Sequence, residues 1–232
     1  MPEPQIPHRI VHTRNRHSRA VYRGNEIIIR LARNLGPRQE QEHIESLRRR
    51  MTQHVVKELQ KTHIDPFRRL LEGAERDTIE LSNGSQYTIE LTPGKNTRVR
   101  LTNEGWRIAI GPTLRRAELS RLLWRMVSVQ ESPRMEELVN IINQQTFNER
   151  IGSVRLRHMR SQWGSCSHRH GIVLNAALLF VPGELLHYVI VHELGHIRHQ
   201  NHSGAFWNHL AEVIPECLEL RRELTQFRIC EL

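Results

Sequence analysis

The stretch VIVHELGHIRHQNHSGAFW, residues 189–207, decides the fold and carries the clearest chemical motif of the chain. His192 and His196 are four residues apart, so on an α-helix both imidazoles project from the same face and can bind one metal ion. Glu193 can reach a water on that metal without occupying a ligand position. Apolar residues recur at helical intervals around the motif, namely Leu185, Leu186, Val189, Ile190, Leu194 and Ile197. The pattern predicts a half-buried helix that presents two metal ligands and a general base.

A third ligand is expected after the helix ends, because a catalytic zinc usually has three protein ligands and one open position. His202 is the candidate. Residues 199–201 can turn the chain back over the ion, since Asn tolerates the left-handed conformation that often ends a helix. Ser203 can then cap a following helix. Glu212 and Glu216 are alternative ligands in principle.

Several ordered blocks in the last third of the chain resemble the YgjP-like metallopeptidase-domain family, which is related to the WLM and SprT zincins. The blocks are QWGSCS at 162–167, GIVLN at 171–175, PGELL at 182–186, VHELGH at 191–196, NHS at 201–203 and FW at 206–207. The resemblance implies a gluzincin-like core in which His192, His196 and His202 bind a zinc ion and Glu193 is the catalytic base. Gly195 stands where the family often has Cys, so thiol chemistry is not expected there.

The QWGSCS block predicts a tight turn after a strand at 154–159, followed by a short strand at 172–175. In zincins the strand nearest the active helix can bind an extended substrate by strand addition, and 172–175 is expected to be that edge. Cys166 is interpreted as a turn residue, because no base near it in the sequence would activate it as a nucleophile. Four side chains remain candidates for the group that donates a hydrogen bond to the transition state, since no spacing selects among them. They are Tyr188, His168, His170 and His199.

The N-terminal half contains one pattern twice, in the order strand, turn, strand, Gly-Pro break and helix. The first copy covers residues 19–61 and the second covers 98–127. Between them, residues 78–81 and 86–91 flank an Asn-Gly turn and predict a hairpin. This half is therefore expected to mix strands and helices.

Further helices are expected at 114–127, 135–148 and 216–227. Together with the motifs they suggest three parts. These are a basic flexible arm at residues 1–18, an N-terminal α+β region at 19–132 and a zincin-like catalytic portion at 133–232.

Composition limits the possible partners. The formal charge of +9 arises from 34 Lys and Arg against 25 Asp and Glu, which favours a nucleic acid or nucleotide partner through a basic surface. Many Arg residues alternate with Glu on predicted helical faces, however, and a solvated surface explains that mixture as well. The three Cys have no spacing typical of a disulfide framework, so we expect a reducing, cytoplasmic setting. No run of about 18 apolar residues and no secretory signal is found, so no membrane partner is expected.

The predicted fold class is α+β, with a mixed sheet lying against the active-site helix. The predicted function is a zinc-dependent metallopeptidase that cleaves protein or peptide bonds, with Glu193 as general base and a zinc-bound water as nucleophile. One alternative is a metal-dependent nucleoside-triphosphate pyrophosphatase, as some YgjP-like proteins are described, although no GxxxxGK phosphate loop is present. The other is a catalytically silent zinc-containing module that binds protein or DNA, against which the intact Glu193 argues.

Overall fold

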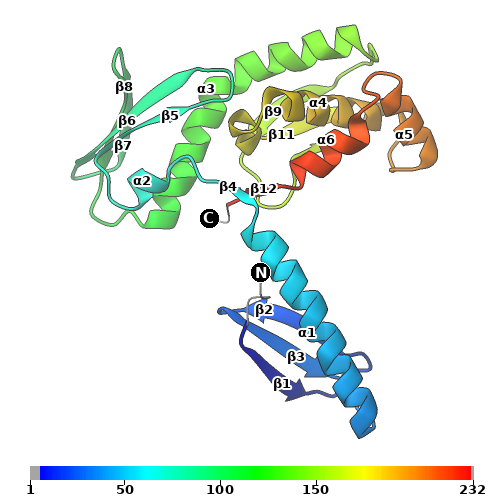
Figure 1. Cartoon of the computed structure of the whole chain (residues 1–232). Helices are drawn as coiled ribbons and strands as arrows, with labels where there is room; N and C mark the ends of the chain where they lie inside the picture. The colour runs from blue at the N-terminus through cyan, green and yellow to red at the C-terminus, as the bar shows by residue number, and fades with distance from the viewer. Residues whose placement is uncertain (1–5, 231–232) are drawn as a thin grey trace. The chain divides into compact units, whose positions relative to one another are not determined.

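The computed structural model describes residues 6–230 (Figure 1). The chain forms two compact units, with the boundary after Lys61, because most contacts of each unit lie within it. The boundary expected after residue 132 falls inside a continuous helix of the second unit. Of the expected flexible arm, residues 1–5 lie outside the described part, whereas His8–His12 forms a strand.

The first unit is a three-stranded sheet with one long helix. Its elements are β1 (His8–His12), β2 (Arg19–Arg23), β3 (Glu26–Leu31) and α1 (Pro37–Leu59). The strand order is β1-β3-β2, with β1 parallel and β2 antiparallel to β3. Gly24 and Asn25 both have φ of +60°, as the tight turn between β2 and β3 requires. One face of the sheet buries Ile27, Ile29 and Leu31 against α1, where they form a separate small core.

The second unit begins with a four-stranded sheet of order β5-β6-β8-β7. Its elements are β4 (Thr62–Ile64), α2 (Arg68–Leu71), β5 (Arg76–Glu80), β6 (Gln86–Pro93), β7 (Arg98–Thr102) and β8 (Gly105–Ile110). The β5–β6 hairpin confirms the hairpin expected around the Asn-Gly turn, in which Gly84 has φ of +82°. Gly105 has φ of +126°, and a Cβ there would lie 2.2 Å from the Thr88 carbonyl oxygen, so only glycine fits at the start of β8.

The repeated sequence pattern corresponds to a repeated structure. In the first unit the β2–β3 hairpin has β1 parallel to its second strand, and in the second unit the β7–β8 hairpin has β6 parallel to its second strand. A long helix follows each copy. The second strand of each hairpin buries an isoleucine at the corresponding position, Ile29 in β3 and Ile108 in β8. Both copies therefore share one strand arrangement.

Helix α3 (Arg116–Gln145) is a single 30-residue helix, where the sequence predicted two helices separated near residue 130. Pro133 lies inside it, and a proline removes one backbone hydrogen bond of a helix. Val127 and Met135, on either side of the proline, are both fully buried. Their burial stabilises the continuous helix against the local cost of Pro133, so the two-helix prediction is wrong.

The remaining elements surround a three-stranded sheet of order β10-β11-β9. They are β9 (Ser153–Arg157), β10 (Gly164–Cys166), β11 (Gly171–Asn175), the 3-10 helix η1 (Ala176–Phe180), α4 (Gly183–Arg198), α5 (Gly204–Ala211), α6 (Cys217–Leu224) and β12 (Phe227–Ile229). Three expectations from the sequence are wrong here. The segment expected as a turn forms strand β10, and β11 is the central strand, so it cannot be the free edge. The C-terminal helix is also shorter than expected, because Phe227 already belongs to β12, which pairs with β4.

Asn175 fixes the loop that leads into β10. Its side chain is fully buried, and its amide donates to the carbonyl oxygens of Met159 at 2.8 Å and Gln162 at 2.7 Å. Its side-chain oxygen accepts hydrogen bonds from the backbone N–H groups of Met159 and Ala177. The loop preceding β10 is thus held by one side chain.

We expect Asn175→Ala to lower the free energy of unfolding by about 3 kcal/mol, because buried backbone groups lose their partners. Urea denaturation at constant m-value measures the change. Asn140, exposed on α3, provides the control, and its replacement by Ala should change stability by less than about 0.5 kcal/mol. Equal effects of the two substitutions would show that the Asn175 contacts do not hold this loop.

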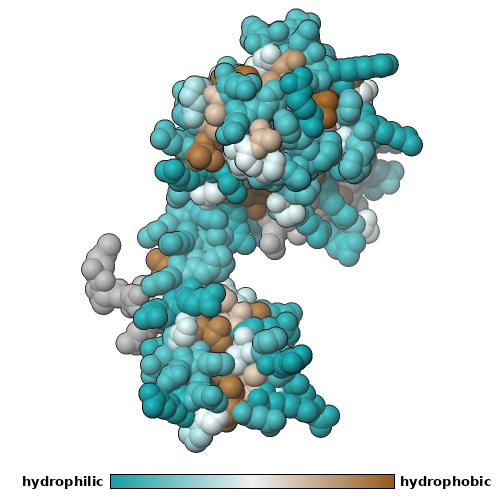
Figure 2. Space-filling view, turned by 90° about the vertical axis from the view of Figure 1, so that its right-hand side faces the viewer, coloured by the Kyte–Doolittle hydropathy of each residue, from teal (hydrophilic) through white to brown (hydrophobic). Residues whose placement is uncertain are grey.

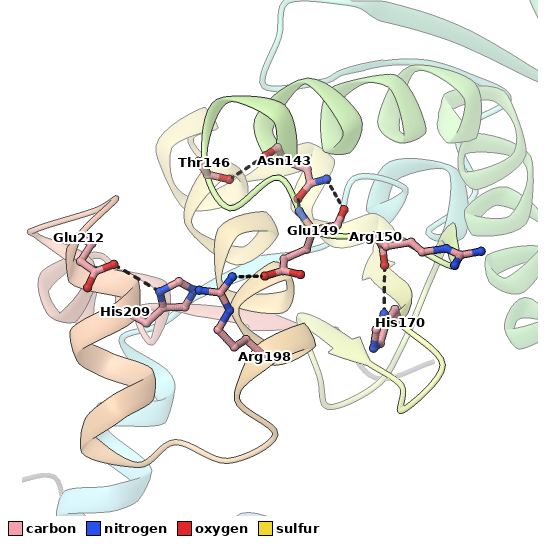
Figure 3. A network of polar contacts seen from close by, with 8 residues as sticks. All are labelled: Asn143, Thr146, Glu149, Arg150, His170, Arg198, His209 and Glu212. Atoms are coloured by element: carbon pink, nitrogen blue, oxygen red, sulfur yellow. Dashed lines mark hydrogen bonds and ion pairs between the residues drawn. The ribbon is translucent and has the colours of Figure 1, made fainter.

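Figure 3 shows a second group of contacts, which connects the ends of α3 and α4. The Asn143 amide donates to the carbonyl of Glu149, and its oxygen accepts from the Glu149 N–H. The Glu149 carboxylate forms an ion pair of 2.5 Å with Arg198, the last residue of α4. The segment preceding β9 is therefore tied to the point at which the chain leaves the helix that carries the HELGH motif.

The core of the second unit is continuous from its four-stranded sheet to α4 and α6. On the face drawn in Figure 2 the surface is predominantly hydrophilic, with hydrophobic residues in small separate patches. Among the described residues, no helix combines the length and hydrophobicity needed to cross a bilayer. The mixed arrangement of strands and helices confirms the predicted α+β class.

Candidate metal centre

Helix α4 places His192 and His196 side by side, as their spacing predicts. The helix is buried along most of its length, including Leu185, Val189, Ile190 and Leu194. The two imidazole centroids lie 4.9 Å apart. Both side chains are half-buried, so the face of α4 that carries them lies at the boundary between core and solvent.

His202 joins the two helical imidazoles. The helix ends at Arg198, and the following segment returns the chain so that one ligand nitrogen from each of the three His lies within 4.8 Å of the others. His202 Nε2 lies 2.9 Å from His192 Nε2. Ser203 occupies the expected N-cap position of α5, but its side chain forms no capping hydrogen bond.

The three imidazoles fit a zinc ion by the chemistry of their donors. The outer nitrogen of His196, Nδ1, lies 2.8 Å from the carbonyl oxygen of His199, which holds the proton on Nδ1 and leaves Nε2 as a lone-pair donor. His192 Nδ1 lies 3.4 Å from the Tyr188 hydroxyl. Three nitrogen donors facing one point, with their other nitrogens partly supported by protein groups, are the ligand set that catalytic zinc prefers.

Aromatic rings from α5 form an apolar wall behind the three imidazoles. Phe206 is fully buried and stacks on His196, with ring centroids 4.6 Å apart and an interplanar angle of 22°. Trp207 stacks on His202 at 5.7 Å, and the Arg221 guanidinium lies 5.0 Å from the Trp207 ring centre. Burial, with the neighbouring imidazoles, lowers the pKa of His192 to about 3. This ring is consequently neutral near pH 7 and available as a ligand.

Glu193 lies beside the His cluster without belonging to it. Its side chain is only 5% exposed, and burial raises its pKa to about 8. A Cβ placed on Gly164 would lie 2.6 Å from Glu193 Oε1, so the carboxylate packs directly against the backbone of β10. Residue 164 must be small for Glu193 to keep this position.

The other sequence candidates lie in different surroundings. Burial, followed by the charge of Glu193, raises the pKa of the Cys166 thiol to about 11, which does not favour a nucleophilic thiolate. Tyr188 is the one proposed donor whose hydroxyl contacts a cluster imidazole. His170 instead contacts the Arg150 carbonyl. Glu212, considered as a ligand, contacts His209 and is not part of the group formed by the three His.

Three features of the site had no recognisable signal in the sequence. These are the steric fit of Gly164 to Glu193, the support of His196 by the His199 carbonyl, and the packing of Phe206 on the ligands. Phe206 also packs closely on Gly195, because a Cβ there would lie 3.2 Å from the Phe206 ring and would require the ring to shift slightly. A pattern of residue types does not specify such contacts between elements.

Comparison with known proteins identifies the group to which this architecture belongs. The family model described as YgjP-like, metallopeptidase domain, matches residues 15–227. The chain therefore belongs to the YgjP-like metallopeptidase-domain family, as the sequence blocks indicated. No curated protein matches the chain.

Two solved structures resemble part of the chain. The metallopeptidase zymogen of Pyrococcus abyssi abylysin is 27% identical, with 41% of this chain and 99% of that one covered and a TM-score of 0.36. The metallopeptidase zymogen of Methanocaldococcus jannaschii jannalysin is 30% identical, with 40% of this chain and 94% of that one covered and a TM-score of 0.35. The family match thus covers far more of the chain than either structure.

Proposed function

We propose that this protein is a zinc-dependent peptidase in which His192, His196 and His202 bind the metal and Glu193 is the general base. One observation carries the proposal. Three imidazole nitrogens lie within 4.8 Å of one another, and an almost fully buried carboxylate follows the first of these His residues on the same helix. Membership in a metallopeptidase family supports the proposed peptidase function.

The chemistry divides between the metal and the chain. A bound zinc ion supplies a Lewis acid that polarises the scissile carbonyl and lowers the pKa of the attacking water. Glu193 accepts a proton from that water and returns it to the leaving amine. Burial raises its pKa in the metal-free protein, which makes the carboxylate a stronger base and favours its acceptance of the proton. Phe206 and Trp207 keep the imidazoles oriented.

The substrate we propose is an extended segment of protein or peptide, bound along β10. This strand has one neighbouring strand, β11, among the described residues, and it packs beside α4. An edge strand can offer its free backbone groups to an extended chain by strand addition. Because Gly164 of β10 touches Glu193, a peptide paired with β10 lies close to the proposed base.

The proposal is tested with zinc-loaded protein, an unfolded protein substrate and nucleoside triphosphates in parallel. We expect new peptide N-termini, detected by mass spectrometry, and no triphosphate hydrolysis above that of the Glu193→Gln variant. Triphosphate hydrolysis that depends on Glu193, without peptide cleavage, would instead establish the pyrophosphatase alternative. Zinc binding with neither activity would identify a catalytically silent module.

We expect Gly164→Ala to reduce peptide hydrolysis by about 100-fold, since the added methyl displaces the Glu193 carboxylate and small misplacements of catalytic groups are costly. Zinc content should stay unchanged, because the side chain that the methyl displaces, Glu193, is not one of the three proposed ligands. Gly183→Ala is the matched control, as a Cβ at that position meets no atom within 4 Å. Steady-state kinetics and metal analysis of both variants check the prediction, and an unaffected kcat/KM in Gly164→Ala contradicts it.

A further inference from the structure

The positive charge of the chain is concentrated in the first unit. Residues 1–61 contain 13 Lys and Arg against six Asp and Glu, a net charge of +7. Residues 62–232 contain 21 Lys and Arg against 19 Asp and Glu, a net charge of +2. The unit that holds the proposed active site is thus nearly neutral, whereas a unit about one third its length accounts for most of the +9. The excess charge is not needed for the peptidase site.

Five arginines gather at one end of the β1-β3-β2 sheet. We call them the arginine cluster, which consists of Arg14, Arg16, Arg19, Arg30 and Arg33. The loop between β1 and β2 is fixed against the end of β3, because Thr13 N–H donates to the Leu31 carbonyl and Arg33 N–H donates to the Asn15 carbonyl. Arg14 and Arg16 belong to the loop between β1 and β2, Arg19 to β2 and Arg30 to β3, and Arg33 follows Ala32 after β3.

The open face of the sheet presents two of these arginines directly opposite each other. Ile29 and Leu31 point toward α1, so Arg30 between them points to the opposite face. Arg19 is the cross-strand partner of Arg30. Like charges in this arrangement are destabilising unless an anion lies between them. The ion pairs of this unit lie elsewhere, and none of the five guanidinium groups has a carboxylate partner among the described residues.

The second copy of the strand motif also has two opposed arginines, Arg100 and Arg107, but there two carboxylates partly balance the charge. There Arg107 of β8 pairs with both Glu90 and Glu104 at 2.8 and 2.7 Å. The position of β8 that corresponds to Arg30 is Ala109, counted from the hairpin turns. The two copies share their strand arrangement but differ in charge, so the fold does not account for the arginine cluster.

We infer that the first unit binds the phosphate backbone of a nucleic-acid duplex through the arginine cluster. Guanidinium groups match phosphate oxygens in pairs, and a duplex presents about one negative charge per 1.7 Å of its axis. The side chains that β1, β2 and β3 place on the open face include no aromatic ring, since Tyr22 pairs with Ile27 on the α1 side. A platform for stacking single-stranded bases is therefore absent from this face, which favours backbone contacts to a duplex.

The test measures binding of the full chain to a fluorescent 20-base-pair duplex, to one of its strands, and to vesicles containing anionic phospholipid. Arg19→Gln/Arg30→Gln removes the opposed pair, while Arg98→Gln/Arg100→Gln removes two exposed arginines from β7, the corresponding strand of the second copy. We expect Arg19→Gln/Arg30→Gln to bind the duplex at least about ten-fold more weakly than the original protein. The slope of log affinity against log salt concentration should fall by the equivalent of about two phosphate contacts. The control variant should stay within about two-fold of the original protein.

Several results would overturn the inference. Equal weakening by the two variants would indicate a nonspecific charge effect, and tighter binding to the single strand or to vesicles would identify a different partner. Absence of salt-dependent duplex binding would also exclude it. Thermal unfolding of Arg19→Gln/Arg30→Gln excludes misfolding, because removing two like charges should not destabilise the sheet. Hydrolysis of a free peptide should be unchanged in this variant, so the outcome is independent of the proposed peptidase activity.

Discussion

Glu193→Gln should abolish most peptide hydrolysis while leaving the fold and the zinc content intact. Loss of a general acid–base group typically lowers the rate by about 10²–10⁴-fold, and the glutamine amide cannot accept the proton. The neutral amide has nearly the same shape as the carboxyl. Because burial raises the pKa of Glu193 to about 8, a neutral group at this position does not disturb the core.

Steady-state kinetics and elemental analysis of the same preparations separate catalysis from binding. The effect should fall on kcat with little change in KM, since the proposed general base acts on the reacting groups and not on substrate binding. Glu149→Gln serves as a control, because it makes the same substitution at a less buried carboxylate, which pairs with Arg198 at the end of α4. Loss of zinc in Glu193→Gln would mean that Glu193 is a ligand, and full activity would mean that another group is the base.

His202→Ala should lose both the metal and the activity. Removing groups that merely support a metal ligand lowers affinity by about 10–100-fold, so removal of one of three ligands should lower zinc affinity by more than about 100-fold. Competition with a chromogenic chelator measures this affinity. His202 is exposed and follows the helix, so the substitution should leave the secondary structure unchanged.

His199→Ala is the matched control for the histidine substitution. The contact with His196 uses the backbone carbonyl of residue 199, which alanine retains. We therefore expect zinc affinity in His199→Ala to stay within a few-fold of the original protein. Similar losses in the two variants would show that the imidazole of His199, and not that of His202 alone, contributes to the site.

The parts that the sequence predicts best depend on short-range geometry. Placing His192 and His196 on one face requires only the helical period, and α4 covers both positions. The same holds for the hairpin around Gly84 and for the repeated strand motif, whose turns are encoded by local residue types. The prediction that His202 lies beside the other two His depended on the ordered family blocks. Sequence spacing alone left Glu212 and Glu216 as alternative third ligands.

The parts that the sequence missed depend on contacts between distant elements. Helix α3 continues through Pro133 because residues on both sides are buried by other parts of the unit. Strand β10 was expected as a turn, since its Gly and Ser residues have low strand propensity, but pairing with β11 overrides that preference. The fit of Gly164 to Glu193 is likewise a product of tertiary packing.

Zinc K-edge X-ray absorption of the purified, zinc-loaded protein tests the central claim most directly, because it identifies the atoms bound to the metal. We expect nitrogen or oxygen ligands at about 2.0–2.1 Å with three imidazoles among them, and one imidazole fewer in His202→Ala. A sulfur ligand at about 2.3 Å, or a spectrum that His202→Ala leaves unchanged, would contradict the assignment of His192, His196 and His202 as the metal centre.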